Sequence, residues 1–201
     1  MNILAISCSP RKRGATVEVL EEALRGAKEE GSNVELYSVS GKTLNGCVSC
    51  YSCREKGECI LEDDMAELLS KMAEADGILF GTPIYYYGMT AQAKAIIDRS
   101  FSMNTPEKSL KNKVGGIVTV AGSLGMVDAL KDFYFFFAVR QMLPASYVAI
   151  YSGAVDDLKK LEKGMKAARD LGRQMVKLAE KKFEYPEEFP PRPLAFGTHT
   201  Y

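Results

Sequence analysis

The chain has 201 residues, of which 46% are hydrophobic and 26% charged, and its 26 basic and 26 acidic side chains give a formal net charge of zero. This balance is typical of one globular domain with a single core. It argues against a nucleic-acid-binding protein, which needs a basic face. No stretch approaches the roughly 20 apolar residues that cross a membrane, and the N-terminus lacks the basic leader of a signal peptide. We therefore expect a cytoplasmic protein without membrane contact.

The first elements in chain order are predicted to be a strand, a polar loop and a helix. Residues 2–7 form a short apolar run without polar alternation, which is typical of a central parallel strand covered on both faces. Apolar residues then recur at helical spacing from Val17 to Ala27, and Gly31 is expected to end the helix.

The polar loop between this strand and helix is a candidate phosphate site. A helix start offers unpaired amides and a partial positive charge, to which Ser9 and Thr16 would add hydroxyl groups and Arg11 or Lys12 a positive charge. The alternative is that Ser9 and Thr16 only cap the helix and the basic residues form a solvated turn. The loop matches neither a P-loop nor the Gly-x-Gly-x-x-Gly pattern, so both interpretations stay open.

A second strand is predicted over residues 34–39, and a cysteine-rich loop follows it at about residues 41–62. Four of the five cysteines, Cys47, Cys50, Cys53 and Cys59, have the spacing Cys-x2-Cys-x2-Cys-x5-Cys. Such sulfurs converge on one centre, and three in a tight row favour an iron-sulfur cluster over zinc, whose ligands usually form two separated pairs. Zinc, a disulfide or redox thiols, and no cofactor remain the alternatives.

The helix after the cysteine loop is expected to begin at Asp63 or Asp64, with Glu67 placed as in a capping box. The loop itself, about two dozen residues long, far exceeds an ordinary connection. Its length therefore indicates a function or a bound cofactor.

Two further strands are predicted to end in ligand-binding loops. The third covers residues 77–82 and runs into Pro83-Ile84-Tyr85-Tyr86-Tyr87-Gly88, where adjacent tyrosines cannot all face a core. A helix is expected from about 89 to 102. The fourth strand covers residues 115–120 and leads into a turn with Gly122, Ser123 and Gly125, where glycine allows either a close approach to a ligand or a plain turn.

The last third of the chain is predicted to contain two helices and one strand. The run 133–137, Phe-Tyr-Phe-Phe-Phe, is apolar all round, which favours a subunit interface over the core of so small a protein. A fifth strand is expected at 146–151 and a long helix from Asp156 or Asp157 to about Lys182. The tail 186–201 is rich in proline and cannot be helical, and His199 within it is expected to be solvated.

Five strands alternating with helices predict an α/β fold with a parallel sheet and right-handed crossovers. Ligands of such sheets bind outside the carboxyl ends of the strands. The loops after the first, third and fourth strands meet at that edge, so each supports the others as part of one site.

With these features the chain resembles the NADPH-dependent FMN reductase superfamily, and within it the iron-sulfur flavoproteins of anaerobic archaea and bacteria. The resemblance rests on three stretches within about the first 125 residues, namely Ser-Pro-Arg-Lys-Arg-Gly-Ala-Thr at 9–16, Gly-Thr-Pro-Ile-Tyr-Tyr-Tyr-Gly at 81–88 leading into Lys-Ala-Ile-Ile-Asp-Arg at 94–99, and the cysteine run. It implies a flavodoxin-like three-layer sandwich over residues 1–185, with strand order 2-1-3-4-5. It further implies FMN, a 4Fe-4S cluster and assembly as a homodimer or homotetramer.

The resemblance implies that the first loop holds the FMN phosphate and that the third and fourth loops hold its ring. The cofactor-binding residues would be Ser9, Arg11, Lys12, Ala15, Thr16, Thr82, Pro83, Ile84, Tyr85, Tyr86, Gly88, Gly122, Ser123 and Gly125, and the cluster ligands Cys47, Cys50, Cys53 and Cys59. Two positions depart from the family pattern, with Cys8 in place of a glycine and Ala15 in place of an asparagine. We expect Cys8 to be a small buried hydrophobic residue and not a fifth ligand.

The expected function is electron transfer between a ferredoxin-like one-electron donor and an acceptor, through the cluster and FMN. Electron transfer needs no side-chain acid or base, so no catalytic residue is assigned. One alternative is an NAD(P)H-dependent FMN or quinone reductase without a cluster. Another is a zinc-stabilised interaction module without redox chemistry.

Overall fold

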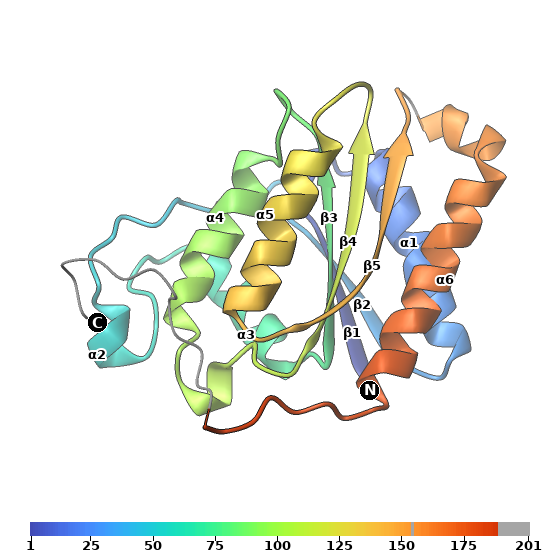
Figure 1. Ribbon diagram of the computed structural model, residues 1–201. Helices are drawn as coiled ribbons and strands as arrows, with labels where there is room; N and C mark the ends of the chain where they lie inside the picture. Colours follow the sequence, from blue (N-terminus) through green and yellow to red (C-terminus); the bar gives the residue numbers. More distant parts are fainter. Residues whose placement is uncertain (154, 189–201) are drawn as a thin grey trace.

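The computed structural model describes residues 1–153 and 155–188, so His199 and the tail beyond Glu188 lie outside the described residues. Its centre is a five-stranded sheet with the order β2-β1-β3-β4-β5, in which every neighbouring pair is parallel. Helices cover both faces, as Figure 1 shows. The predicted α/β class, three-layer arrangement and strand order are therefore confirmed.

The strands and helices follow one another in the alternation that the sequence predicts. The strands are β1 (Asn2–Ser7), β2 (Asn33–Ser38), β3 (Gly77–Pro83), β4 (Val114–Ala121) and β5 (Leu143–Tyr151). The α-helices are α1 (Ala15–Glu29), α2 (Cys53–Lys56), α3 (Met65–Glu74), α4 (Ala91–Arg99), α5 (Met126–Val139) and α6 (Glu162–Ala179), and the 3-10 turns are η1 (Ser100–Ser102), η2 (Pro106–Lys108) and η3 (Val155–Lys160). Within the part of the chain that the structure describes, no helix has the length and apolar character needed to cross a membrane.

The start of the last helix differs from the prediction. Asp156 and Asp157 lie in the 3-10 turn η3, and α6 begins only at Glu162. The reason lies in the packing, because Leu158 is buried against the core while Leu161 leaves the helical region with φ −105° and ψ 48°. A capping signal in the sequence cannot report this tertiary contact.

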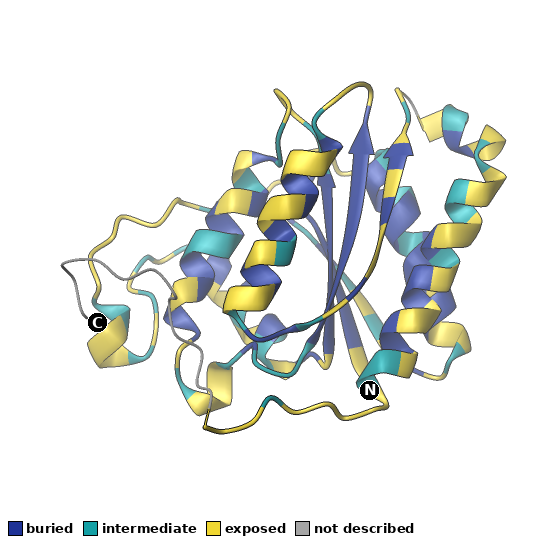
Figure 2. Cartoon of the chain, in the orientation of Figure 1, coloured by how far each residue is buried: buried dark blue, intermediate teal, exposed yellow. Residues whose placement is uncertain are grey.

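The two helical layers bury separate halves of the core (Figure 2). On one face, α1 and α6 pack against the sheet through residues such as Leu20, Leu171 and Met175. On the other face, α3, α4 and α5 enclose Phe80 and Ile117 of the central strands. Strands β1, β3 and β4 are almost wholly buried, as expected of parallel strands covered on both sides.

The aromatic run of α5 faces the core more than the sequence suggested. Phe133, Phe136 and Phe137 are buried, and their ring centroids lie 5.1, 6.0 and 6.0 Å from that of Phe80. Phe137 fits because Gly115 beneath it has no side chain, and a Cβ atom there would lie 2.8 Å from the ring. The expectation that this run mainly forms a subunit interface is therefore wrong for these three residues.

The remaining two aromatic residues of the run differ, because Tyr134 packs against the edge of the core and Phe135 points away from it. Tyr134 is half-buried and donates a hydrogen bond to the Ala145 carbonyl at 3.0 Å, whereas Phe135 is 73% exposed. Only Phe135 of the five therefore offers its ring to solvent or a partner.

Helices α1 and α6 cross with their backbones in contact at two glycines. A Cβ atom added at Gly172 of α6 would overlap the Ala23 carbonyl of α1, and one at Gly26 would overlap the Arg169 carbonyl of α6. The Glu22 carboxylate accepts a hydrogen bond from Arg169 Nε at 2.6 Å across the same crossing. The close approach of α1 and α6 thus depends on glycine at both positions, Gly26 and Gly172.

We expect the substitution Gly172→Ala to lower the free energy of unfolding by at least about 2 kcal/mol, because the helices must separate to admit the methyl group. Thermal and urea unfolding monitored by circular dichroism measures this change. The matched control is Gly164→Ala in the same helix, where the added Cβ would meet side chains and no backbone, namely Ile150 at 3.3 Å and Leu161 at 3.9 Å. The control should be neutral or slightly stabilising, and equal losses for both variants would contradict the close crossing.

Candidate functional site

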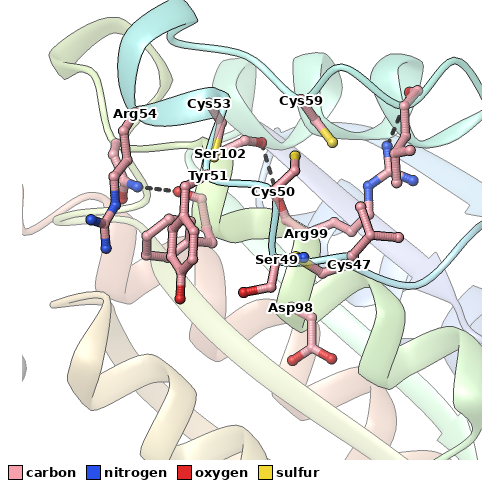
Figure 3. A pocket seen from close by; sticks show the side chains of 14 residues that line it. Cys47, Ser49, Cys50, Tyr51, Cys53, Arg54, Cys59, Asp98, Arg99 and Ser102 are labelled. Atoms are coloured by element: carbon pink, nitrogen blue, oxygen red, sulfur yellow. Dashed lines mark hydrogen bonds between the residues drawn. The ribbon is translucent and has the colours of Figure 1, made fainter.

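The cysteine segment forms one wall of a cavity of about 730 Å³ beside α4 (Figure 3). All five cysteines of the chain are free thiols. Four of them line this cavity, with Cys47 and Cys50 exposed and Cys53 and Cys59 half-buried. The four predicted ligands therefore lie around one cavity, although within residues 1–153 and 155–188 no three His, Cys, Asp or Glu side chains are close enough to hold one metal ion. All four are free thiols, so the alternative of a disulfide does not match the structure.

The backbone of the cysteine loop is strained around its central cysteine. Ser49 and Tyr51, on either side of Cys50, have φ angles of 54° and 58°, in the left-handed region that side chains disfavour. The Ser49 amide donates to Cys47 Sγ at 3.4 Å. Hydrogen bonds from the backbone and hydroxyl of Ser52 lower the pKa of the Cys50 thiol. The strained backbone is thus found together with hydrogen-bond donors that point to cysteine sulfur atoms. Such donors stabilise thiolates.

The four thiols also form one electrostatic group. Desolvation raises the pKa of the Cys53 thiol, and the negative charges of Cys59, Cys50 and Cys47 raise it further. Four such thiolates repel one another unless a cation or cluster compensates their charge. The donor set is therefore one that suits a metal centre.

Aromatic contacts hold the outer part of the loop against the chain after α4. The Tyr51 ring meets the Phe101 ring edge-on with centroids 6.3 Å apart, and the Arg54 guanidinium lies 4.4 Å from the Tyr51 centroid. Cation–π and edge-to-face contacts of this kind each contribute about 1 kcal/mol. They fix the side of the cavity that carries Cys50 and Cys53.

The inner stems of the loop are joined by Asp63, one of the two residues predicted to cap α3, through partners that the sequence did not reveal. Its Oδ1 accepts from the Met65 amide at 3.1 Å, which caps α3, while Oδ2 accepts from the Asn45 amide at 2.8 Å and from Arg99 Nη1 at 2.6 Å. Arg99 holds the pKa of this carboxyl below its ordinary value in spite of the desolvation that opposes it. Asp63 therefore ties both stems of the loop to α4.

The predicted capping box between Asp64 and Glu67 is wrong. Asp64 makes no side-chain capping bond to α3. Instead, the Glu67 carboxylate accepts from Lys42 Nζ at 3.0 Å and from the Tyr37 hydroxyl at 3.4 Å. These partners lie on β2 and on the residues after it, so the sequence spacing alone did not reveal them.

Arg99 is the residue of this site whose role sequence analysis missed. Its side chain is fully buried and pairs with Asp63. A signal was present, because the spacing in α4 places Arg99 on the same helical face as the buried Ile96 and Ala95. A charged residue on an apolar face requires a buried partner.

The predicted flavin residues lie in three loops at the carboxyl edge of the sheet. These loops contain Ser9, Arg11, Lys12, Ala15 and Thr16 after β1, Thr82, Pro83, Ile84, Tyr85, Tyr86 and Gly88 at the end of β3 and after it, and Gly122, Ser123 and Gly125 after β4. Figure 1 shows these loops at the upper end of the sheet and the cysteine segment, with α2, on the flank beyond α4. The predicted flavin residues and the cysteine segment therefore lie at two different places on the molecule.

The predicted phosphate loop leads into a helix whose start has no side-chain cap. Gly14 is the N-cap of α1, and no side chain accepts a hydrogen bond from the first turn. Thr16 lies buried within the helix, and Ser9 Oγ accepts instead from the Arg11 amide at 3.2 Å. The interpretation that Ser9 and Thr16 only cap this helix is therefore wrong, and its first amides suit an anion.

The loop after β3 is a tight turn with two tyrosines in left-handed conformations. Tyr85 and Gly88 exchange backbone hydrogen bonds at 3.0 and 3.2 Å, and Tyr86 and Tyr87 between them have φ angles of 48° and 67°. Such a turn normally uses glycine or asparagine. Tyr86 is 98% exposed as a result, so the backbone strain presents an aromatic ring at the open edge.

Two predicted cofactor residues, Thr82 and Gly125, connect the loops after β1, β3 and β4 to one another. Thr82 is buried, and its hydroxyl donates to the Pro83 carbonyl at 2.9 Å and accepts from the Thr90 amide at 3.2 Å. The Thr90 hydroxyl in turn donates to the Cys8 carbonyl at 2.9 Å. Gly125, with φ 104°, packs against the Tyr87 backbone, where a Cβ atom would lie 2.5 Å away. Thr82 and Gly125 thus hold the three loops together.

Cys8 is buried within this arrangement, as expected from its position at a strand end. Burial raises the pKa of its thiol to about 12. A thiol of this kind stays protonated, so Cys8 has the character of a small hydrophobic residue.

Comparison with known proteins identifies the family. The family model described as NADPH-dependent FMN reductase matches residues 1–155. An iron-sulfur flavoprotein of Methanocaldococcus jannaschii is 38% identical over 194 residues, covering 90% of this chain and 100% of the relative. An iron-sulfur flavoprotein of Archaeoglobus fulgidus is 31% identical over 187 residues, covering 91% of this chain and 82% of the relative.

Among solved structures, a flavodoxin from the domain Archaea matches with a TM-score of 0.60 and 15% sequence identity, covering 90% of this chain and 99% of the other. This likeness shows that the fold is flavodoxin-like. The chain therefore belongs to the NADPH-dependent FMN reductase family, has relatives that are iron-sulfur flavoproteins, and is a flavin-dependent oxidoreductase.

Proposed function

We propose that this oxidoreductase transfers electrons between a ferredoxin-like carrier and an acceptor, using FMN at the carboxyl edge of the sheet and a 4Fe-4S cluster held by Cys47, Cys50, Cys53 and Cys59. When bound, FMN exchanges one or two electrons and a 4Fe-4S cluster exchanges one at a time, so the pair connects the two kinds of chemistry. The observation that carries the proposal is the set of four free thiols around one cavity in a member of an FMN reductase family.

The spacing of the four cysteines along the chain favours a cluster over a single zinc ion. Structural zinc usually takes its ligands as two separated pairs, whereas three cysteines in a tight row with a fourth nearby are typical of iron-sulfur ligation. Within residues 1–153 and 155–188, no three His, Cys, Asp or Glu side chains are gathered closely enough to hold one metal ion, so the cluster is supported by this spacing and by the names of the relatives.

The flavin part of the proposal rests on the three loops at the sheet edge. The uncapped start of α1 would bind the phosphate, with Ser9, Arg11, Lys12, Ala15 and Thr16 around it. Pro83, Ile84, Tyr85, Tyr86 and Gly88 would line one side of the ring, and Gly122 and Ser123 the other. Thr82 and Gly125 would not line the flavin directly but would position the loops that line it.

We also propose that the chain assembles as a homodimer or homotetramer in the cytoplasm. Large apolar side chains are exposed near the flavin loops and along α5, among them Tyr86, Leu124, Val127 and Phe135. A second copy of the chain that covered these side chains would remove them from water. Free thiols at an exposed loop favour a reducing compartment.

An NAD(P)H-dependent FMN or quinone reductase without a cluster is the second candidate, and the family description favours it. In that case the same flavin loops would receive electrons from a nicotinamide instead of a ferredoxin-like carrier. The zinc-stabilised module without redox chemistry is not proposed again, because the chain is a flavin-dependent oxidoreductase.

The cofactor content of protein purified and reconstituted without oxygen tests the proposal. We expect about four irons and four sulfides with one FMN per chain, measured by chemical analysis and the visible spectrum. Cys59→Ala should lose most of the iron because it removes one ligand. Cys8→Ala, which changes the fifth cysteine, should retain it. Flavin without iron in the unaltered protein would support the NAD(P)H reductase instead.

A pair of glycine substitutions tests the flavin position. Gly122 has no atom within 4 Å of an added Cβ, so Gly122→Ala should keep the fold but weaken FMN binding by about tenfold, or about 1.4 kcal/mol, because the methyl group would occupy ring space. Gly125→Ala should instead lower stability by about 1–3 kcal/mol, since it strains a left-handed residue. Flavin fluorescence titration and thermal unfolding of the flavin-free protein measure the two effects. Unchanged FMN affinity in Gly122→Ala would place the ring elsewhere.

A further inference from the structure

Arg99 at the end of α4 combines deep burial with a permanent charge. It is 2% exposed and is among the largest fully buried side chains. Burial lowers the pKa of its guanidinium, but the hydrogen bond and charge of Asp63 and the charge of Cys59 outweigh this, so the pKa lies above its ordinary value. Removing such a charge from water costs several kcal/mol unless its donors are paired. The hydrogen-bond partners of Arg99 therefore indicate the role of this buried charge.

Three of these partners lie at the two stems of the cysteine segment. Nη1 donates to Asp63 Oδ2 at 2.6 Å and to the Asn45 carbonyl at 3.2 Å. Nη2 donates to the Leu61 carbonyl at 3.2 Å. Asn45 precedes Cys47 by two residues and Leu61 follows Cys59 by two, so one guanidinium clamps the segment on both sides.

One donor of this guanidinium remains available. Arg99 Nε is buried and has no hydrogen-bond partner within the described residues, although nearly all buried donors in folded proteins are paired. Arg99 and Cys59 both line the cavity of the four cysteines, and Figure 3 shows the Arg99 side chain extending along the side that carries Cys59. The negative charge of a Cys59 thiolate is among the causes that raise the pKa of the guanidinium, as expected of two groups in one cavity.

We propose that Arg99 Nε donates a hydrogen bond to the Cys59 sulfur when that sulfur is an iron ligand, and thereby raises the reduction potential of the cluster. The inference rests on the proposed function, because it requires a cluster at these cysteines. Hydrogen bonds to ligand sulfurs and a nearby positive charge both favour the reduced form of the cluster, which carries one more electron. Arg99 would thus be a positioning residue that also adjusts the potential.

The substitution Arg99→Lys tests this role while it keeps the charge. Lysine cannot present the fork that holds Asp63, Asn45 and Leu61 and also reach the Cys59 sulfur. We expect the midpoint potential of the cluster to shift downward in an anaerobic redox titration, and iron loss to a chelator to become about tenfold faster. The matched control is Arg140→Lys, which changes a second arginine whose donors go to Asn104 and the Met103 carbonyl. The control should leave the potential unchanged.

A spectroscopic measurement separates the hydrogen bond from a purely structural role. In protein labelled with 15N only in arginine, pulsed electron paramagnetic resonance of the reduced cluster should show a 15N coupling. That coupling should disappear in Arg99→Lys and persist in Arg140→Lys. Replacement of Arg99 could leave Asp63 unpaired and prevent folding. In that case the double variant Asp63→Asn with Arg99→Gln, which is neutral at both positions, provides the same test. Its midpoint potential should shift further downward, because the positive charge is also lost.

The outcomes distinguish this inference from the proposed function. A wild-type protein without iron and sulfide would overturn both. A wild-type cluster whose potential and 15N coupling are unchanged in Arg99→Lys would overturn the role of Arg99 alone. A potential that shifts equally in Arg99→Lys and Arg140→Lys would also overturn it, because the effect would then be independent of Cys59.

Discussion

The parallel sheet is the constraint from which the rest of this molecule follows. Because all five strands run the same way, every strand ends at one edge, and the loops after β1, β3 and β4 meet there. The loop after β2 starts at the same edge but leaves it, and the buried pair of Asp63 and Arg99 attaches its stems beside α4. One chain thus presents two candidate sites, one formed by the topology of the sheet and the other attached by a buried ion pair.

The energetics of these two places differ. The flavin loops rest on a core of strands and on a network in which Thr82, Thr90 and the Cys8 carbonyl share hydrogen bonds. The cysteine segment has no buried residue in α2 and depends on the ion pair at its stems and on the aromatic contact between Tyr51 and Phe101. A buried ion pair adds little net stability compared with apolar residues of similar size. Its value here lies in holding the two stems at a defined separation.

Much of this architecture was predictable from the sequence, and the exceptions have physical causes. Apolar runs and helical spacing indicated all five strands, and the resemblance to a family implied their order, which the structure confirms. The shared centre that the cysteine spacing indicates stays a prediction. The capping box at Glu67 and the helix start at Asp156 were wrong because tertiary partners, Tyr37 with Lys42 and the buried Leu158, outweighed local signals. The role of Arg99 depends on residues 36 to 54 positions away in the chain, which no local pattern contains.

The contact between Gly125 and the Tyr87 backbone joins two loops that are far apart in the sequence into one rigid body. Neither loop can change its length or path without displacing the other, since a left-handed glycine in one abuts left-handed tyrosines in the other. An insertion in either of these two loops is therefore expected to displace the other. Diversification of this molecule towards new acceptors would have to proceed by exchange of single side chains, above all at the exposed Tyr86, on a frame whose backbone stays constant.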